Sequence, residues 1–426
     1  MEQIVTFAVA WRSDFVDPWT WYDHPHLPHN HFMPPWLPTA VIYEINTRNF
    51  SPTADFRGVE ARLLDLQNLG VTVLWLMPIH PFGQAKRKGT VGSPYAVRDY
   101  YAINPEYGTA ADLHRLIRKA HGLGFRVIID IVANHTSWDS ILMEHTSFYK
   151  HDAAGRIIPP QPDWDDGAAL DYANPQLRTY MINMLKHWLV EFQLDGFRCD
   201  VAGFVPTDFW EQARAELEKV KPDVFMLAEW DSPDLLHKAF DLDYSWPLHK
   251  SLNAVLMEGS PARLLRQTHE QQRARFQPGA LHMRFSDNHD EQRAIARFGL
   301  AGALAASAFM FTLDGVPLLY NGMEVGDSTE SGAPALFEKV PVLWQMAERR
   351  PQFAKFYGEM IPLRRAHPAL QQGELIWTPN ADDARLLTYT RRDARESIPV
   401  TINFSNQPMG DLPAFGFKIG DRLLLP

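Results

Sequence analysis

The chain of 426 residues is 46% hydrophobic and 22% charged, which is typical of a folded globular protein with a large core. Its net charge of -10 excludes a strongly basic surface, so we predict neither a nucleic-acid nor a membrane partner. The single cysteine, Cys199, excludes an intramolecular disulfide.

Residues 1–38 are rich in Trp, Pro and His and show no regular hydrophobic period, so we predict an extended N-terminal arm. Four histidines between positions 24 and 31 could bind a metal ion. The prolines among them and the lack of a nearby cysteine favour a surface arm over a metal site.

Between residues 39 and 367, short apolar runs alternate with amphipathic helical patterns. Helices are expected at 59–69, 109–123, 175–192 and 207–220, with others up to 365, and strands at 40–45, 71–79, 125–132, 195–202, 223–228, 240–244, 281–286 and 316–320. Strands that alternate with helices pair in parallel, and eight such units predict a (β/α)8 TIM barrel over 39–367. No glycine-rich phosphate-binding motif follows a strand, which argues against an open nucleotide-binding sheet.

Two segments depart from this alternation, and a third is unusually apolar. Residues 136–172 are too long for an ordinary connection, so we predict a short inserted domain, domain B, after the third strand. Residues 300–313 are apolar but too short to span a bilayer, which indicates a buried helix. Residues 368–426 contain short runs at 374–377, 385–390, 398–404 and 422–425, which predict a small C-terminal β domain.

The fourth predicted strand carries the sequence Gly196-Phe197-Arg198-Cys199-Asp200. Side chains alternate along a strand, so Arg198 and Asp200 are expected on the same side. A structural ion pair would explain this stretch taken alone. Charged and imidazole groups also follow other strands, however, at His135 after the third, Glu229 after the fifth, and His289 and Asp290 after the seventh.

The carboxyl ends of barrel strands meet at one face, so these groups are predicted to converge there. A packed core could not neutralise so many charges cheaply. The chain has no Ser-His-Asp arrangement in a nucleophile-elbow context, and the HxH and HExxH metal spacings are missing from this face. Paired carboxylates over a sugar cleft are what glycoside hydrolysis requires.

These motifs resemble those of glycoside hydrolase family 13, the α-amylase family, from about residue 40 to residue 404. Four signature regions are similar to Asp130-Ile131-Val132-Ala133-Asn134-His135, Gly196-Phe197-Arg198-Cys199-Asp200, Glu229-Trp230 and Phe285-Ser286-Asp287-Asn288-His289-Asp290. Ser93-Pro94-Tyr95 resembles the segment that supplies a stacking tyrosine, and Gln161-Pro162-Asp163-Trp164 resembles the fifth signature.

The resemblance implies a role for each site residue. Asp200 is the expected nucleophile, Glu229 the acid/base, and Asp290 the group that holds sugar hydroxyls and favours a distorted ring. His135 and His289 are expected to hydrogen-bond the same sugar, Tyr95 to stack on it, and Arg198 and Trp230 to complete the substrate site. A retaining mechanism places the Asp200 and Glu229 carboxyls about 5–5.5 Å apart.

The position of the charges in the sequence indicates how the two carboxyls divide the work. Arg198 is two residues from Asp200 on the same strand face, whereas Glu229 has no cation nearby in sequence and precedes Trp230. That setting predicts an ionised Asp200 and a Glu229 whose pKa is raised.

Departures from the family pattern bear on cofactor and specificity. Asn134 matches a calcium-binding position of many amylases, but the residues after Asp200 are not the Lys-His pair of those enzymes and no Asp-rich calcium loop follows the first strand. We therefore predict no cofactor and no metal ligand, with calcium as the alternative. Ala96 stands where exo-acting α-glucosidases carry an Asp, and Val201 resembles enzymes that also accept α-1,6 bonds.

The leading hypothesis is a retaining hydrolase of α-1,4 and α-1,6 bonds in maltooligosaccharides or starch-like α-glucans. An α-glucan or sucrose-type transglycosylase would use the same site and is the first alternative. A catalytically inactive binding relative is disfavoured, because all three carboxylates are present. We expect a cytoplasmic protein, from the lone cysteine and the lack of a signal-peptide pattern in the first residues, and leave the oligomeric state open.

Overall fold

The computed structural model describes residues 33–330 and 332–424. Residues 1–32, 331, 425 and 426 lie outside the described residues. The predicted N-terminal arm and its four histidines fall almost entirely on that first segment, so both stay predictions.

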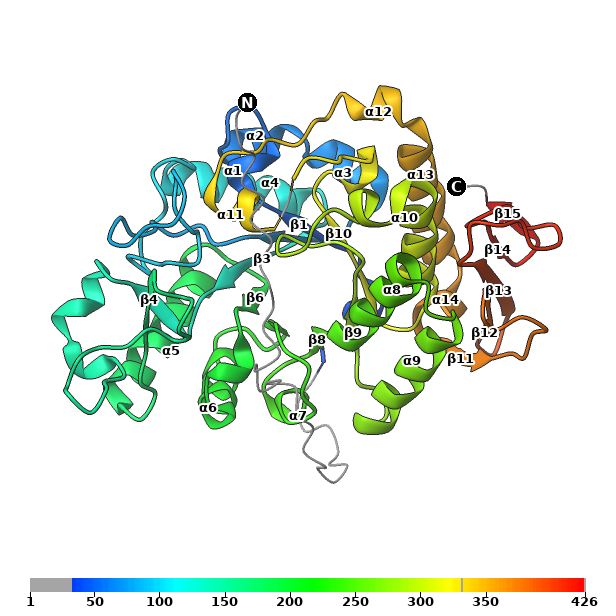
Figure 1. The fold of residues 1–426 in the computed structure, drawn as a ribbon. Helices are drawn as coiled ribbons and strands as arrows, with labels where there is room; N and C mark the ends of the chain where they lie inside the picture. The colour runs from blue at the N-terminus through cyan, green and yellow to red at the C-terminus, as the bar shows by residue number, and fades with distance from the viewer. Residues whose placement is uncertain (1–32, 331, 425–426) are drawn as a thin grey trace, which may run out of the picture.

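Eight parallel strands form a closed barrel in the order β1-β2-β3-β6-β7-β8-β9-β10 (Figure 1). Closure is visible in the register of Ile42, which pairs with Val73 of β2 on one side and Leu318 of β10 on the other. The predicted (β/α)8 barrel is therefore confirmed. Seven of these strands are shorter than expected, and the last has the expected bounds: Ile42–Ile45, Val73–Leu76, Arg126–Ile131, Gly196–Cys199, Phe225–Ala228, Leu242–Tyr244, His282–Arg284 and Val316–Tyr320.

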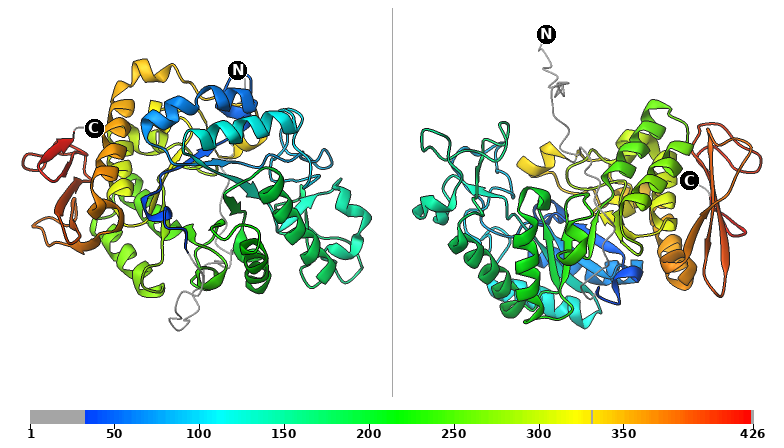
Figure 2. Two further views of the ribbon diagram at one scale, coloured as in Figure 1. Left: turned by 180° about the vertical axis from the view of Figure 1, so that it is seen from behind. Right: turned by 90° about the horizontal axis from the view of Figure 1, so that it is seen from below.

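Helices surround the barrel (Figure 2). The helix expected at 59–69 is two helices, α2 and α3, because the backbone leaves helical geometry at Arg62. Helix α4 begins with a capping box in which Thr109 and Asp112 satisfy each other's backbone N–H groups. The principal helices are α2 (Phe56–Ala61), α3 (Leu63–Leu69), α4 (Ala110–Gly122), α5 (Pro175–Glu191), α6 (Thr207–Glu218), α8 (Trp246–Glu258), α9 (Arg263–Arg275), α10 (Ala294–Thr312) and α13 (Pro351–Ala366).

The core has two layers separated by the barrel wall. The outer layer lies between strands and helices and includes Val41 and Tyr43, while the inner layer fills the barrel and includes Ala40 and Ile42. Side chains alternate along β1, so Glu44 shares the inward direction of Ala40 and Ile42. The carboxyl group of Glu44 therefore points toward the apolar interior of the barrel.

Helix α10 (Ala294–Thr312) is long and apolar enough, by length and composition, to cross a membrane. In the structure, 67% of its most apolar window is buried, and it packs against β10, α13 and strand β13 (Ser397–Asn403) of the C-terminal sheet. It is the core helix of a folded domain, as the sequence predicted for 300–313.

The predicted insertion after the third strand contains a two-stranded antiparallel sheet, β4 (His135–Ser137) with β5 (Gly167–Ala169). The C-terminal β domain is confirmed as a five-stranded antiparallel sheet in the order β11 to β15. Its strands are Glu374–Trp377, Leu386–Arg392, Ser397–Asn403, Phe417–Ile419 and Arg422–Leu424, of which the fourth was not predicted. Helix α14 (Pro368–Gln372), which precedes the sheet, was also missed.

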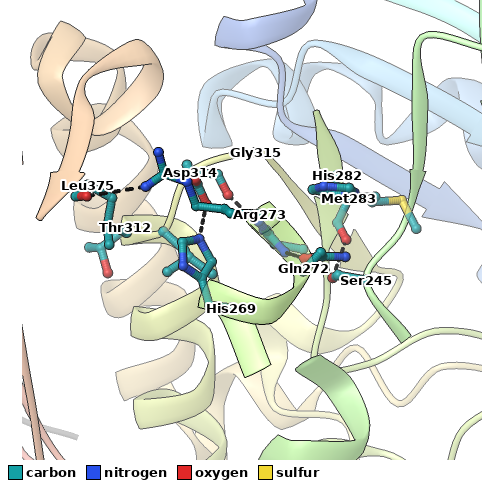
Figure 3. A network of polar contacts seen from close by, with 12 residues as sticks. Ser245, His269, Gln272, Arg273, His282, Met283, Thr312, Asp314, Gly315 and Leu375 are labelled. Atoms are coloured by element: carbon teal, nitrogen blue, oxygen red, sulfur yellow. Dashed lines mark hydrogen bonds and ion pairs between the residues drawn. The ribbon is translucent and has the colours of Figure 1, made fainter. Parts of the chain in front are cut away.

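Buried polar groups join the barrel to this domain. Arg391 donates from Nη1 to the carbonyls of Thr312 and Leu370, at 2.7 and 3.0 Å, and from Nη2 to Gly373 O at 2.9 Å. Figure 3 shows the neighbouring network, in which Asp314 contacts His269 of α9 and Arg273 reaches Leu375 O. Unsatisfied carbonyls would be costly at this junction, so these arginines fix the packing of the sheet on the barrel.

Candidate active site

Arg198 is the centre of the charged group at the carboxyl ends of the strands. It comes from β6, and its side chain is fully buried. The register pairs Asp130 of β3 with Arg198, so both side chains enter the barrel at the same level. Nη1 of Arg198 donates to Asp130 Oδ1 and to Asp200 Oδ1, each at 2.9 Å. The predicted proximity of Arg198 and Asp200 is therefore present.

The same guanidinium also contacts the second carboxyl. Nη2 of Arg198 lies 2.8 Å from Glu229 Oε2, although its N–H makes no aligned hydrogen bond there. Glu229 Oε2 accepts a hydrogen bond from the Val201 N–H at 2.7 Å. Glu229 has no cation nearby in sequence, but the structure places Arg198 beside it, because β6 and β7 are adjacent strands.

Both carboxyls have a raised pKa, and burial is the principal cause for each. Arg198 opposes the rise at both, and a hydrogen bond from Glu229 further opposes it at Asp200. At Glu229, by contrast, the negative charge of Asp200 adds to the rise in pKa. The mutual contact therefore favours a proton on Glu229 and an ionised Asp200.

Asp290, His289 and Tyr95 form a second group beside the first. His289 Nε2 lies 3.2 Å from Asp290 Oδ2 and 2.7 Å from the Tyr95 hydroxyl, and the rings of His289 and Tyr95 stack at 5.3 Å. The Tyr95 hydroxyl donates to Asp130 Oδ2 at 3.1 Å, which joins both groups. Burial and the charge of Glu229 raise the pKa of Asp290 to about 7, against the effect of His289.

His135 and Trp230 border these groups. Burial lowers the pKa of His135 to about 4, and its ring lies 5.9 Å from that of Trp164. The half-buried indole of Trp230 packs on Phe204 at 5.0 Å. It also lies so close over Gly203 that a Cβ there would stand about 2 Å from its ring atoms. Trp164, Phe204 and Trp230 thus form an aromatic row beside Glu229.

Two side chains of the site were not assigned a role from the sequence. Asp130 was noted only as part of a motif. It is completely buried and accepts hydrogen bonds from both Arg198 and Tyr95. Glu44 is completely buried and contacts Nδ1 of His289. One feature of the sequence could have identified Glu44: it is the single carboxylate in the otherwise apolar run 41–45. It lies two residues after Ile42, so its side chain points in the same direction, into the barrel.

The donor set does not match a calcium site at Asn134. The side-chain nitrogen of Asn134 faces Nδ1 of His135 at 3.4 Å, and its backbone carbonyl accepts from the Leu170 N–H. The acidic segment nearby in domain B is neutralised by Lys88, whose ammonium lies 3.1 Å from Asp165 and 3.3 Å from Asp166. Within 33–330 and 332–424, no three His, Cys, Asp or Glu side chains are grouped as metal ligands. The lack of a cofactor stays a prediction.

A cavity of about 750 Å³ lies elsewhere, between the start of β9, the turn before β10 and the start of the C-terminal sheet. Its lining includes Arg273, His282, Arg284 and Asp314, several of which are seen in Figure 3. None of the residues at the carboxyl ends of the strands contributes to it. The cavity is therefore separate from the charged groups at the carboxyl ends of the strands.

Comparison with known proteins agrees with this geometry. The profile of the family "Alpha amylase, catalytic domain" matches residues 44–166 and 161–358. Alpha-amylase MalA of Haloarcula japonica is 28% identical over 393 residues, which cover 88% of this chain and 57% of that protein. A cyclomaltodextrinase of Geobacillus thermopakistaniensis is 26% identical over 425 residues, covering 88% and 70% respectively. The chain thus spans little more than half the length of the Haloarcula relative.

Solved structures give the same result. The maltogenic alpha-amylase AmyB of Thermotoga neapolitana is 33% identical with a TM-score of 0.80, and the match covers 86% of each chain. An alpha-amylase of Lactobacillus plantarum is also 33% identical with a TM-score of 0.80, over 89% of this chain and 92% of that one. The chain therefore belongs to the α-amylase family, glycoside hydrolase family 13.

Proposed function

We propose that this enzyme is a retaining hydrolase of α-glucosidic bonds in maltooligosaccharides or starch-like α-glucans. The observation that carries the proposal is the pair Asp200 and Glu229, which share Arg198 at the ends of adjacent strands. Retaining enzymes hold their two carboxyls closer together than inverting ones do, and the shared contacts with one guanidinium keep Asp200 and Glu229 close to each other.

The protonation of the pair supports a division of roles. Asp200, held ionised by Arg198, attacks the anomeric carbon and forms the glycosyl ester as the glycosidic bond breaks. Glu229 donates its proton to the leaving oxygen in that step. In the second step it removes a proton from water, which attacks the anomeric carbon and releases Asp200 as a carboxylate.

The remaining residues fit recognition of the sugar at the point of cleavage. Asp290 has the most exposed side chain of the three carboxyls, at 33%, so its oxygens can receive sugar hydroxyls. Tyr95 and His289 border it, and the aromatic row of Trp164, Phe204 and Trp230 begins beside Glu229. Because Glu229 protonates the leaving oxygen, that row is placed to stack on the leaving part of the chain.

The names of relatives support an α-glucan substrate. They include alpha-amylases and cyclomaltodextrinases, and AmyB of Thermotoga neapolitana is named a maltogenic alpha-amylase. Cleavage of α-1,4 bonds is proposed from the membership of the α-amylase family. Cleavage of α-1,6 bonds is proposed from Val201, which follows the nucleophile.

The test is product analysis with maltose, isomaltose, sucrose, trehalose, pullulan and soluble starch. Release of reducing sugar from maltooligosaccharides, with the α-configuration in the first product seen by NMR, is the expected result. A β-configured first product would overturn the retaining mechanism, and no release from any α-glucoside would overturn the hydrolase. Longer products at high maltose would show transfer to sugar in place of water.

We also propose a cytoplasmic location. A relative from Bacillus subtilis that is 27% identical over 375 residues is named an intracellular maltogenic amylase. The single cysteine of this chain is buried as a free thiol, as is usual for proteins of a reducing compartment. Fractionation of native cells tests the proposal, and recovery of the protein mainly outside the cytoplasm contradicts it.

A further inference from the structure

We propose that Glu44 is a positioning residue that holds His289 as an N–H donor at Nε2, toward Asp290 and the sugar. Glu44 touches no reacting atom and acts through the imidazole ring. The inference rests on the proposed function, since it assigns a residue of the first barrel strand to the hydrolytic site.

Glu44 occupies an unusual place for a carboxyl. On β1 it pairs with Trp75 of β2 and Tyr320 of β10, and its side chain is completely buried. Oε1 contacts Nδ1 of His289, whereas Oε2 has no hydrogen-bond partner among the described residues. A buried, half-satisfied carboxyl costs stability, and an apolar residue would fill the position at lower cost. The contact to His289 is the feature that an apolar residue could not provide.

The neighbours of Nε2 decide where the proton must lie. The Tyr95 hydroxyl donates its one proton to Asp130, so toward His289 it is an acceptor. The second neighbour, Asp290 Oδ2, accepts when ionised. Nε2 therefore needs a proton of its own. In a neutral ring Nδ1 is then a bare acceptor, and it requires a donor or a shared proton on the other side.

Glu44 supplies that shared proton. Its pKa is raised to about 8 by burial, against the opposing charges of Arg198 and Arg293. Burial and the charge of Arg198 lower the pKa of His289, while Asp290 and Glu229 oppose this. These directions favour a protonated Glu44 that donates to Nδ1 of a neutral ring. If the shared proton moves from Glu44 to Nδ1, the pair becomes an imidazolium beside a carboxylate. The number of protons is the same, and Nε2 is again a donor.

Without the Glu44 carboxyl, nothing fixes the proton of the His289 ring at Nε2. With leucine at position 44, the neutral imidazole can hold its proton at Nδ1, and Nε2 then presents a lone pair to Asp290 and Tyr95. That arrangement repels the carboxylate, withdraws a donor from the sugar, and weakens the hold on Asp290. Glutamine can donate its amide N–H to Nδ1 and keep the proton at Nε2.

The experiment compares Glu44→Leu, Glu44→Gln and wild type in purified full-length chains. Glu44→Leu is expected to lower kcat on maltotriose about 100-fold or more, with a smaller change in KM, while Glu44→Gln stays within about tenfold of wild type. The matched control is Glu324→Leu, since Glu324 is another buried carboxyl, bonded to Tyr43 on the outer side of β1. It should lose stability and retain kcat in the folded fraction.

The ¹⁵N spectrum of the His289 imidazole, assigned through His289→Gln, reads the proton position without activity. Wild type and Glu44→Gln are expected to carry the proton at Nε2, and Glu44→Leu at Nδ1. An unprotonated Nε2 in wild type, equal loss of kcat in both variants, or full activity of Glu44→Leu would overturn the proposal. If wild type hydrolyses no α-glucoside, the proposed function fails, while the spectrum still tests the role of Glu44.

Discussion

Nη2 of Arg198 lies 2.8 Å from Oε2 of Glu229, across the adjacent strands β6 and β7. One buried guanidinium thus serves both carboxyls of the proposed catalytic pair, and Asp130 as well. Its charge alone cannot distinguish nucleophile from acid, because it lowers the pKa of both. The distinction comes from the contact between Asp200 and Glu229, which lowers one pKa and raises the other.

The division of roles predicts opposite behaviour of two variants. Glu229→Gln should lose about 10²- to 10⁴-fold activity on maltooligosaccharides, because their leaving oxygen needs a proton. An activated aryl α-glucoside should still form the glycosyl-enzyme, and added azide should restore turnover as α-glucosyl azide. Mass spectrometry of the trapped intermediate and NMR of the azide product provide the measurement.

Asp200→Asn is the counterpart, since it cannot form the covalent intermediate. Azide should give no α-configured product with it. If azide rescued Asp200→Asn with retained configuration and left Glu229→Gln inactive, the two roles would be reversed.

The close approach of Gly203 and Trp230 predicts a defect in chain binding. In Gly203→Ala the new methyl group would stand about 2 Å from the indole ring, so Trp230 must move off its place beside Glu229. Loss of one stacking contact of about 1 kcal/mol should raise KM for long maltooligosaccharides roughly fivefold, with a smaller effect on aryl glucosides. Steady-state kinetics over chain lengths measures this.

Gly358→Ala is the matched control for that change, because nothing lies within 4 Å of its added Cβ on helix α13. It should leave KM unchanged at every chain length. A Gly203→Ala enzyme with wild-type KM for long chains would show that Trp230 does not contact the substrate.

His249 predicts a specific loss of stability in acid. It is buried against Phe285, and burial with the charge of Arg297 lowers its pKa to about 3, from about 6.5 in the unfolded chain. Between these values the unfolded state binds more protons, so stability falls as pH falls through 6.5 toward 3. At pH 4.5 His249 therefore lowers the free energy of unfolding by about 2–3 kcal/mol relative to pH 7.

Thermal unfolding between pH 7 and pH 4.5 tests this expectation. His249→Gln should show a smaller decrease in Tm across that range than wild type, whatever its Tm at pH 7. His151→Gln, at an exposed histidine, should follow the wild-type slope. Equal slopes for His249→Gln and wild type would contradict the prediction.

The junction with the C-terminal sheet predicts a further stability difference. Arg391→Met removes the donor to the carbonyls of Thr312 and Gly373 and leaves them buried, whereas Leu370 O keeps its hydrogen bond from Nη1 of Arg364; the loss should cost about 2–4 kcal/mol. Urea unfolding measures the loss. Arg392→Met, at the next residue on the same strand, removes only an exposed ion pair with Glu374 and should cost under about 1 kcal/mol. Similar losses in both variants would contradict a special role for Arg391.

Much of the barrel could be predicted because its signals are local. Each strand is a short apolar run between amphipathic helices, and parallel strands joined by helices have few ways to pack. The positions of Asp200, Glu229, His289 and Asp290 after their strands followed from the same pattern. The short strand Phe417–Ile419 and the split of α2 and α3 at Arg62 were missed, because three apolar residues or one irregular residue give no clear period.

The sequence by itself determined which residue types stand at the ends of which strands. The order of the strands follows from the order of the apolar runs, and the direction of each side chain follows from alternation along a strand. Tertiary structure alone decided how those residues share their charges. Register between β3 and β6 brings Asp130 to Arg198, adjacency of β6 and β7 adds Glu229, and barrel closure places Glu44 of the first strand against His289 after the seventh. These contacts join residues far apart in sequence, and Coulomb and hydrogen-bond energies depend on distance in space.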